Sequence, residues 1–362
     1  MAVPRAPIPV AVLGATGVVG QRFVARLARH PWFCVVALAA SEQNAGKRYD
    51  EACAWRLPTE SHGLAYGGFG AARLRRATPD ELVGLGARIV FSALDTGPAL
   101  ELEPAFAANG AWVFSNASAF RMHADVPLLI PEVNAEHLEL ARVQQRLRGT
   151  RGALVCNPNC TATVLTLALA PLERAFGLSD VMVTSFQAVS GAGYPGVASL
   201  DILGNVVPFI RNEEEKLAEE PAKMLGVWLG DALRPAALRV SAACYRVPVL
   251  DGHTLSVSVR LARSASADDV RAAFESWRGA IAELGLPSAL ARPLVLHASP
   301  DRPQVRLDVD TERGMAVHVG RLRECGVLDF KFSALGHNAE RGAAGASILN
   351  AELALARGLI EP

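Results

Sequence analysis

The sequence predicts an α/β protein of two domains. Its N-terminal part alternates strands and helices: an apolar strand Ile8–Leu13, a glycine-rich turn, a helix Gln21–Arg29 and a strand Cys34–Ala40. This succession is a βαβ unit, which implies parallel strands covered by helices on both faces. After Cys160, strand-like runs follow one another with few helices between them, which predicts an antiparallel or mixed sheet and hence a second domain. The length of 362 residues also suits two domains.

Further short runs complete this outline. Arg88–Ala93 and Trp112–Ser115 extend the first sheet. In the second domain we expect strands at Val181–Val189, Ala242–Leu250, Thr254–Leu261 and Val305–Val309. Asp251-Gly252, between two of these, is typical of a hairpin turn. The stretch from Asn338 to Leu359 predicts a helix of small residues that packs back on the first domain.

The composition argues against several classes of function. Hydrophobic residues make up 51% and charged residues 20%, as in an ordinary globular protein, and 36 basic residues balance 36 acidic ones. We therefore expect no nucleic-acid surface and no basic membrane anchor. No apolar run of about 18 residues exists to span a membrane, and no secretory leader is recognisable. The six cysteines are scattered, and Cys156 and Cys160 lack a second pair, so we expect no metal site and a reducing cytoplasm.

Cys160 is the first candidate for chemistry. It follows the turn-forming Asn157-Pro158-Asn159 and opens the apolar run Ala162 to Leu172, which predicts a buried helix that begins near Cys160. A thiol at a helix N-terminus faces free N–H groups and the positive end of the helix dipole, which depress its pKa. We interpret Cys160 as a nucleophile. The alternative is a small buried hydrophobic residue.

The turn Gly14-Ala15-Thr16-Gly17-Val18-Val19-Gly20 lies between the first strand and the first helix. Such a loop brings backbone N–H groups close to a phosphate, which predicts a dinucleotide site. Its alternative is a tight turn without a ligand. An NAD site usually has an acidic residue at the end of the second strand, whereas this strand ends with Ser41, which favours NADP. Glu42 follows at once and weakens the distinction.

A charged helix is expected from Glu213. Asn212 and Glu215, three residues apart, have the spacing of a capping box. Glu213 and Lys216 would share one face of this helix. A solvated helix with acidic residues in its first turn is the alternative.

Three more polar residues stand out by position. Arg246 and His253 flank the Asp251-Gly252 turn, and His253 has the parity of the apolar Leu255. A histidine there is either a hydrogen-bonded strand end or a general acid/base. Arg121 lies in a polar loop after a strand, where a surface arginine is the alternative.

Taken together, these segments resemble the aspartate-β-semialdehyde dehydrogenases. The resemblance runs from the glycine turn to Gly336-His337-Asn338 and the segment Arg341 to Gly345, and it includes Asn157 to Cys160 and Gln187 to Gly193. The Glu-Glu-Glu-Lys and Arg-Gly-Ala-Ala-Gly forms are closest to the archaeal and fungal branch. The resemblance implies a Rossmann-type domain of residues 1–156 and 337–362. It also implies a catalytic and dimerisation domain of residues 157–336, like that of glyceraldehyde-3-phosphate dehydrogenase.

The resemblance also implies roles for individual residues. For the substrate these are Cys160 as nucleophile, His253 as acid/base, Gln187 to orient the acyl group, Arg246 for the α-carboxylate, Glu213 for the ammonium, and Arg121 and Lys216 for the phosphate. The implied cofactor contacts are Gly14, Thr16, Gly17, Val18, Ser41, Ser190, Gly191 and Asn338.

The implied reaction is the NADP-dependent reduction of L-aspartyl-4-phosphate to L-aspartate 4-semialdehyde and phosphate, an oxidoreductase step in lysine, threonine and methionine biosynthesis. Thiolate attack would form a thioester, and hydride from the nicotinamide would reduce it. His253 would take the thiol proton and return it to the departing sulfur. We expect a homodimer or homotetramer with a small-molecule substrate.

One loop departs from the family pattern. Members with a strong NADP preference usually carry an arginine and a serine where this chain has Gln43 and Asn44. Loss of the guanidinium would weaken NADP binding by about 1.5–3 kcal/mol, unless Lys47 or Arg48 compensates. NAD therefore stays open as a cofactor.

Other functions fit the sequence less well. A malonyl-CoA reductase on the same scaffold is the nearest alternative, but its substrate has no ammonium to pair with Glu213. A dinucleotide-binding regulator would not need Cys160, Gln187, Arg246 and His253 together. A thiol hydrolase would leave the glycine turn without a purpose.

Overall fold

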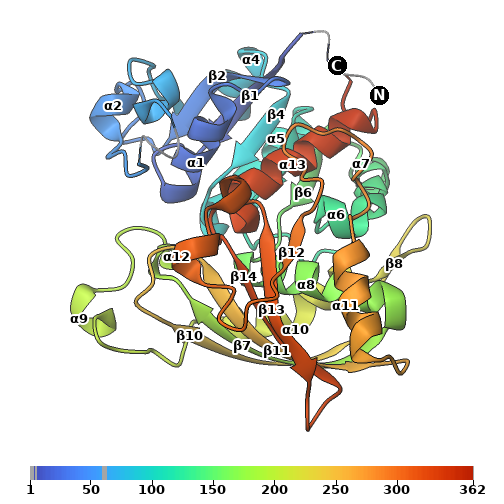
Figure 1. The fold of residues 1–362 in the computed structure, drawn as a ribbon. Helices are drawn as coiled ribbons and strands as arrows, with labels where there is room; N and C mark the ends of the chain where they lie inside the picture. Colours follow the sequence, from blue (N-terminus) through green and yellow to red (C-terminus); the bar gives the residue numbers. More distant parts are fainter. Residues whose placement is uncertain (1–3, 5, 59–62, 362) are drawn as a thin grey trace.

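The computed structural model describes residue 4 and residues 6–58 and 63–361. Within them, the chain forms two six-stranded sheets, one above the other in the view of Figure 1. A separate two-stranded pair is made by β8 (Val227–Trp228) and β9 (Leu233–Arg234). Among the described residues no helix is both long and apolar enough to cross a membrane.

The first sheet is parallel throughout and has the order β3-β2-β1-β4-β5-β6. This is the strand order of dinucleotide-binding folds. Its strands are β1 (Ile8–Leu13), β2 (Phe33–Ala40), β3 (Arg75–Arg76), β4 (Ile89–Ser92), β5 (Trp112–Ser115) and β6 (Ala153–Cys156). The helices of this part are α1 (Val18–Leu27), α2 (Tyr49–Ala52), α4 (Pro79–Gly84), α5 (Thr96–Ala108), α6 (Pro131–Asn134), α7 (Leu140–Arg148) and the 3-10 turns η1 (Ala65–Gly68) and η2 (Ala135–Glu139).

Both faces of the first sheet are buried, as its apolar strands predict. Val10 and Val12 of β1 belong to one core cluster, together with Phe23 of α1. Their neighbours Ala11 and Leu13 belong to another, which includes residues of α4 and α5. The strand is therefore apolar on both sides because helices cover both sides.

The second sheet is mixed, with the order β10-β7-β11-β14-β13-β12. Its strands are β7 (Leu178–Gln187), β10 (Arg239–Arg246), β11 (His253–Leu261), β12 (Leu294–Leu296), β13 (Val317–Glu324) and β14 (Phe330–Gly336). The helices of this part are α8 (Cys160–Phe176), α9 (Ser199–Ile202), α10 (Glu213–Met224), α11 (Ala267–Ser276), α12 (Val305–Asp308) and the 3-10 turns η3 (Val189–Ala192) and η4 (Thr311–Gly314). β7 pairs parallel with β10 and antiparallel with β11, which confirms the expected mixed sheet.

The predicted hairpin at Asp251-Gly252 is wrong. β7 lies between β10 and β11, so the two strands that flank the turn do not pair with each other. The connecting segment instead bonds to the chain after β7, where the N–H of Val189 donates to the carbonyl of Val249 (2.8 Å). A turn dipeptide is a local signal, whereas the choice of partner strand is decided by tertiary packing.

The predicted strand Val305–Val309 is also wrong, because this segment forms the one-turn helix α12. The carboxylate of Asp308 accepts a hydrogen bond from the backbone N–H of Gln304 (2.7 Å) and is held by Arg302. These bonds bury Asp308 at 1% exposure and close the turn. Apolar residues at both ends of a five-residue run fit either a strand or a helical turn.

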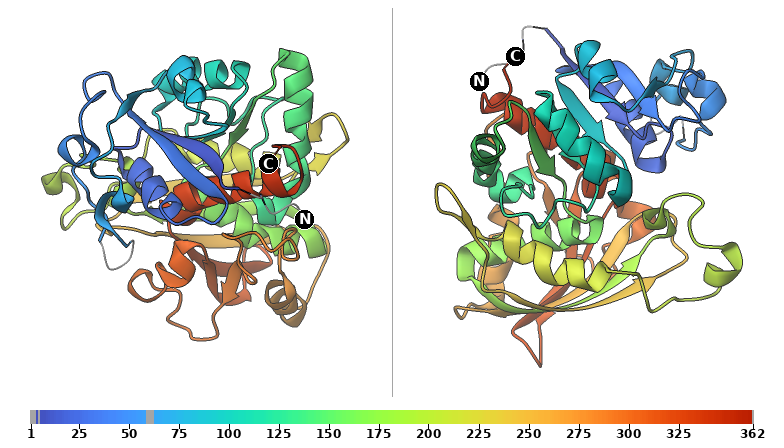
Figure 2. Two further views of the ribbon diagram at one scale, coloured as in Figure 1. Left: turned by 90° about the horizontal axis from the view of Figure 1, so that it is seen from above. Right: turned by 180° about the vertical axis from the view of Figure 1, so that it is seen from behind.

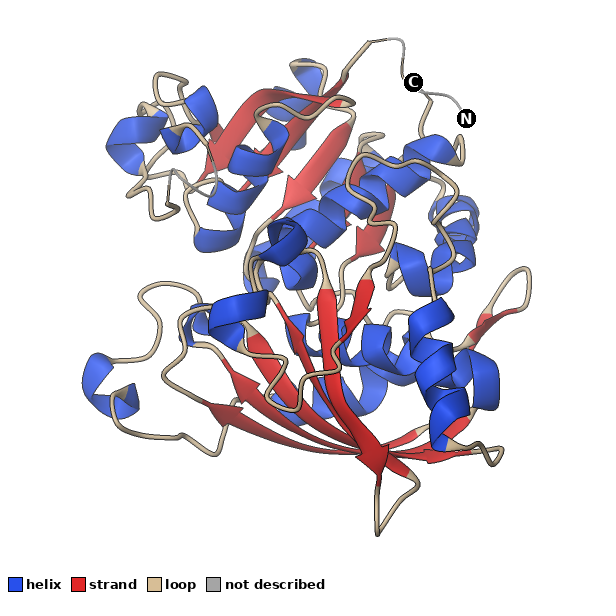
Figure 3. Cartoon of the chain, in the orientation of Figure 1, coloured by secondary structure: helices blue, strands red, loops and turns tan. Residues whose placement is uncertain are grey.

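One face of the second sheet is covered and the other is open (Figure 3). Helices α8 and α11 lie on the covered face, and α10 contacts both α8 and β10. Figure 2 shows α10 in yellow across this sheet, from behind. On the open face, Met182 and Phe186 of β7 are 50% and 39% exposed.

The C-terminal segment returns to the first sheet. It forms the π-helical turn η5 (Glu340–Ala344) and α13 (Gly345–Ala356), and α13 contacts α1, β4 and β5. Glu340 pairs with Arg22 (2.7 Å) and with Arg26, both on α1. Although burial alone would raise it, the pKa of Glu340 is lowered to about 2 by these guanidinium groups. The expected helix is confirmed, while the domain boundaries at 156/157 and 336/337 stay a prediction.

Candidate active site

Cys160 is the first residue of α8, and the side chain of Asn159 fixes this helix start. Its oxygen Oδ1 accepts hydrogen bonds from the backbone N–H groups of Thr161 (2.9 Å) and Ala162 (3.0 Å). This is an N-cap, which satisfies donors that the first helical turn leaves free. The helix therefore begins where the sequence predicts, and Cys160 as a whole residue has intermediate exposure.

His253 lies behind the thiol. It is the first residue of β11 and is fully buried, on the same face as Leu255, Val257 and Val259. Its Nε2 lies 3.2 Å from Sγ of Cys160. The backbone N–H of Ala188 donates to its Nδ1 (3.1 Å). Because Nδ1 is an acceptor in this bond, the proton of the neutral imidazole is on Nε2 and faces the sulfur.

The pKa values make this a neutral pair and correct two predictions. Burial raises the pKa of Cys160 to about 11, and the negative charge of Glu213 adds to the rise. The predicted depression of this pKa is wrong for the substrate-free protein, because the loss of water outweighs the helix N-terminus. Burial, with Arg246 adding to it, lowers the pKa of His253 to about 3. With Nδ1 occupied and Nε2 protonated, His253 is arranged as a hydrogen-bond donor and not as the acceptor of the thiol proton.

Glu213 connects several predicted residues. Its carboxylate accepts hydrogen bonds from Nδ2 of Asn159 (3.0 Å), Nε2 of Gln187 (3.2 Å) and Nζ of Lys216 (2.8 Å). Burial would raise the pKa of Glu213, but Lys216 and the two amides hold it below its usual value. The predicted shared face of Glu213 and Lys216 is confirmed. The predicted cap at Asn212 is wrong, because its backbone is left-handed (φ 59°) and its side chain makes no capping bond.

Arg246 ends β10 beside Gln187, its partner in the sheet register. Its Nη1 donates to the carbonyl of Ala188 (2.7 Å). Gly191 lies against it, since a Cβ there would be 3.0 Å from Nη1 of Arg246 and 3.1 Å from the ring of His253. A side chain at this position would push against both groups, so the close approach depends on glycine.

Arg121 reaches the same place from the loop after β5. Its Nη1 bonds to Glu220 (3.1 Å), and its Nη2 donates to the carbonyl of Asn116 (2.7 Å). The exposed fraction of Arg121 is only 7%, so the alternative of a surface arginine does not hold.

These residues surround one cavity of about 500 Å³. The predicted residues that line it are Val18, Arg121, Cys160, Gln187, Ser190, Gly191, Glu213, Lys216, Arg246 and Asn338. It extends from the start of α1 to the thiol, and so joins the two halves of the chain. Gly14, Thr16, Gly17 and Ser41 lie outside its lining, and His253 is buried behind Cys160.

Known proteins with this arrangement were found by sequence and by structure. The family models that match are described as the NAD binding domain (residues 9–141) and the dimerisation domain (residues 169–339) of semialdehyde dehydrogenases. An aspartate-semialdehyde dehydrogenase of Archaeoglobus fulgidus is 50% identical over 97% of this chain and 99% of its own length. One from Cryptococcus neoformans is 45% identical over 99% of this chain and 100% of its own length.

A crystal structure of the Candida albicans aspartate-semialdehyde dehydrogenase with NADP superimposes with a TM-score of 0.88. It is 39% identical and covers 98% of this chain and 100% of its own. The chain belongs to the aspartate-semialdehyde dehydrogenase family. Its archaeal and fungal relatives confirm the branch that the sequence motifs indicated.

The glycine turn has the geometry that this family needs for a dinucleotide. Gly14 has φ +68°, and a Cβ on Gly20 would lie 2.1 Å from the carbonyl oxygen of Gly14. A Cβ on Gly17, at the start of α1, would lie 3.4 Å from the carbonyl oxygen of Gly14, and no side chain caps the helix. No acidic residue lies in the first turn. The free N–H groups and the helix dipole therefore suit a phosphate group.

Of the remaining predicted cofactor residues, Ser190 and Asn338 line the cavity, whereas Thr16 and Ser41 do not. Asn338 donates from Nδ2 to Oγ of Ser190 (2.8 Å) and accepts from the N–H of Gly252 (2.8 Å). Thr16 lies within the glycine turn, where its carbonyl accepts from Gln21 (2.9 Å). Ser41 is exposed directly after β2. The residues present thus fit a dinucleotide.

Two buried residues of this site, Glu220 and Lys223, were not predicted from the sequence. They lie on α10 at three and four-residue steps from Glu213 and Lys216, so the four share one face of the helix. This spacing was the signal that could have revealed them. Glu220 binds Arg121, and Lys223 binds the loop that carries Arg121.

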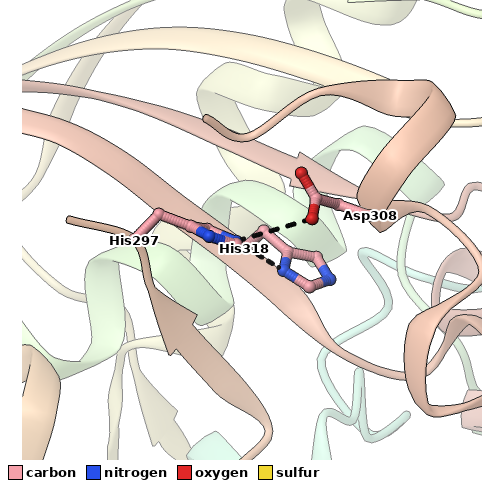
Figure 4. A group of neighbouring side chains, drawn as sticks. All are labelled: His297, Asp308 and His318. Atoms are coloured by element: carbon pink, nitrogen blue, oxygen red, sulfur yellow. Dashed lines mark hydrogen bonds and ion pairs between the residues drawn. The ribbon is translucent and has the colours of Figure 1, made fainter. Parts of the chain in front are cut away.

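A cluster of three side chains of the kinds that bind metal ions was also not predicted from the sequence. His297, Asp308 and His318 lie within 4.8 Å of one another, and Figure 4 shows them. Nε2 of His297 is 3.0 Å from Nδ1 of His318, whose Nε2 contacts Thr311 (2.8 Å). Both carboxylate oxygens of Asp308 are bonded to Arg302. Because the guanidinium occupies the only carboxylate of the group, we interpret it as a hydrogen-bonded network that holds α12.

The high pKa of Cys160 has a measurable consequence. We expect its alkylation by iodoacetamide to speed up about tenfold per pH unit between about pH 7 and pH 9, because the thiolate fraction rises in this way below the thiol pKa. Quantitative mass spectrometry of the peptide that contains Cys160 measures the rate. The partly exposed Cys34 and Cys325 serve as internal references. A rate that levels off below about pH 8 would contradict the neutral pair.

Proposed function

We propose that the protein reduces L-aspartyl-4-phosphate to L-aspartate 4-semialdehyde and phosphate with NADP as cofactor, through a thioester on Cys160, and that it catalyses the reverse reaction. The observation that carries this proposal is the cavity, where one thiol faces a carboxylate, two arginines and a lysine. Family membership supports the same reaction.

Each charged group of the substrate has a complement in the cavity. We assign the α-carboxylate to Arg246, the ammonium to Glu213, and the phosphate to Arg121 and Lys216. Arginine suits a carboxylate or a phosphate because its donors form a planar fork. In the free protein Lys216 bonds to Glu213, so the substrate would compete for this pair. Gln187, bonded to the same carboxylate, would orient the acyl group.

Ammonium binding would also activate the nucleophile. Glu213 is the negative charge that raises the pKa of Cys160, while Arg121 and Arg246 lower it. An ammonium beside Glu213 neutralises its effect and leaves the two guanidinium groups to favour thiolate. The substrate would thus lower the pKa of the thiol that attacks it.

The thioester forms when Sγ of Cys160 attacks the acyl carbon; the bond to phosphate breaks, its electron pair goes to the phosphate, and the thiol proton leaves with that phosphate. The Nε2–H of His253, 3.2 Å from the sulfur, would stabilise the thiolate by donating to it. After the hydride has been added, the C–S bond breaks, its electron pair goes to Sγ, and the same Nε2–H stabilises the departing thiolate by donating to it. NADPH, when bound, supplies the hydride for the reduction of the thioester. Gln187 and His253 supply hydrogen-bond donors near the oxyanion.

The alternatives remain weaker. A malonyl-CoA substrate would leave Glu213, a buried carboxylate, without a cationic partner from the ligand, and the relatives are aspartate-semialdehyde dehydrogenases. A regulator without chemistry would have no reason to place Cys160 3.2 Å from His253. A cofactor-independent hydrolase would not explain the uncapped start of α1.

We also propose a homo-oligomer, a dimer or a tetramer, that forms through the open face of the second sheet. The family model for this part is a dimerisation domain. Phe186 stacks with Tyr245 on this face, with ring centroids 6.2 Å apart, and Met182 lies on the same face of β7, four residues earlier. The six cysteines, all within the described residues, form no disulfide. This agrees with a cytoplasmic protein, which cell fractionation would test.

The reaction is tested by nicotinamide reduction with L-aspartate 4-semialdehyde, with and without phosphate. We expect a rate that requires phosphate and that disappears in Cys160→Ala, because without the thiol no thioester can form. Leu147→Asp, on the exposed surface of α7, should leave the rate unchanged. Absence of a rate with NADP and with NAD would overturn the proposal.

We expect the preference of the protein for NADP over NAD to be modest. Lys47 bonds to Asn44 (3.0 Å) and Arg48 to Asp50 (2.6 Å), so Arg48 is already engaged. Gln43→Arg should raise kcat/KM for NADP about tenfold or more and leave that for NAD unchanged, because it adds a charge-assisted bond to the 2′-phosphate. A wild-type NADP to NAD ratio of about several hundred would contradict the hypothesis.

The oligomer is tested with Phe186→Asp. A carboxylate at this position would be buried on association, so the variant should sediment as a smaller species than the wild type. Leu147→Asp introduces the same charge at a residue that is 73% exposed on α7 and should sediment as the wild type does. Unchanged sedimentation of Phe186→Asp would mean that the subunits associate through another surface.

A further inference from the structure

Helix α10 has one charged face with two functions along its length. Glu213 and Lys216, at its start, line the cavity. Glu220 and Lys223, one and two turns further on, do not line it and are buried at 2% and 6% exposure. Buried charged groups are costly unless they are paired or fully hydrogen-bonded, so these two must be bound to specific partners.

Glu220 joins the nucleophile to the arginine. One carboxylate oxygen accepts from Nη1 of Arg121 (3.1 Å), and the other accepts from the backbone N–H of Asn159 (2.6 Å). Asn159 is the cap of the helix that Cys160 begins. A single rigid carboxylate therefore sets the distance between the guanidinium and the backbone of the nucleophile.

Lys223 holds the loop that carries Arg121. Its Nζ donates to the carbonyl oxygens of Arg121 (2.7 Å), His123 (2.8 Å) and Val126 (2.8 Å). An ammonium group has three donors, and here backbone carbonyls use all three. This fixes the turn of the loop, while Glu220 fixes the guanidinium at the end of the side chain.

We propose that Glu220 and Lys223 are positioning residues, which hold Arg121 and the start of α8 so that phosphate is bound at a fixed place beside the Cys160 thiol. Neither residue touches the substrate. The inference rests on the proposed function, because the phosphate role of Arg121 belongs to it.

The variants Glu220→Gln and Lys223→Met keep the approximate volume of each side chain. In the oxidation of L-aspartate 4-semialdehyde, we expect each to raise the KM for phosphate about tenfold, as for the loss of a charge-assisted bond, and to leave the KM for the aldehyde unchanged. Glu219→Gln is the matched control, because Glu219 is the exposed neighbour on the same helix. A merely structural role would lower the melting temperature and kcat without this separation of the two KM values.

A double-mutant cycle with Arg121→Ala tests whether Glu220 affects phosphate binding through Arg121. If Glu220 acts through Arg121, Glu220→Gln adds little to the phosphate KM in the Arg121→Ala background. Additive effects, or wild-type phosphate KM values in both single variants, would overturn the inference. Should Glu220→Gln fail to fold, Glu220→Asp retains the buried charge, moves it by one methylene and takes its place.

A second readout does not need turnover. Inorganic phosphate at this site should protect Cys160 from iodoacetamide, and the half-protecting concentration should rise about tenfold in both variants. A wild type without phosphate-dependent oxidation would refute the proposed function. The half-protecting phosphate concentrations would still decide whether Glu220 and Lys223 position the anion site. Equal concentrations in the wild type and the variants would refute that positioning role.

Discussion

The site depends on one set of hydrogen bonds, which joins helix α10 to Asn159. The side chain of Asn159 donates to Glu213, and its backbone N–H donates to Glu220. At the same time its Oδ1 caps α8. The side-chain amide, the side-chain oxygen and the backbone N–H of Asn159 are thus all engaged, and two of their partners are buried carboxylates. Because the two carboxylates are seven residues apart on one helix, the position of the Cys160 backbone follows from the position of α10.

The same arrangement explains why the thiol is neutral without substrate. A carboxylate close to a buried sulfur opposes its ionisation, and burial opposes it further. Burial keeps the imidazole of His253 neutral, and the bond from the N–H of Ala188 to Nδ1 leaves the Nε2–H toward the sulfur. A thiol that is ionised at all times would be oxidised or alkylated more readily. In the proposed complex, the substrate ammonium would offset the opposing charge of Glu213, and the reactivity of the thiol would be confined to the bound state.

The sequence predicted the parts of the molecule that follow from local rules. The βαβ unit, the strand Trp112–Ser115 and the helix start at Cys160 follow from apolar periodicity and turn residues, and the structure confirms them. The predicted hairpin at Asp251-Gly252 was wrong because strand order depends on β7, which is distant in sequence. The predicted low pKa of Cys160 was wrong for a related reason. The helix N-terminus is visible in the sequence, whereas burial and the proximity of Glu213 exist only after folding. Glu220 and Lys223 were visible as helical spacing, yet their partners lie about a hundred residues away and carry no signal in the sequence.

The return of the chain to the first sheet completes the site as well as the core. A Cβ on Gly342 would lie 2.5 Å from Cβ of Cys160, so the C-terminal segment passes directly against the nucleophile. Nδ2 of Asn157 donates to the carbonyl of Gly342 (3.0 Å) and fixes this approach. The segment is π-helical here, a wider turn that often occurs at functional sites. Glu340, at its start, binds Arg22 and Arg26 of the helix that follows the glycine turn. Through this one segment, the helix that would meet the cofactor and the helix that carries the thiol are held by the same few residues. The packing of η5 therefore fixes the start of α8 relative to α1.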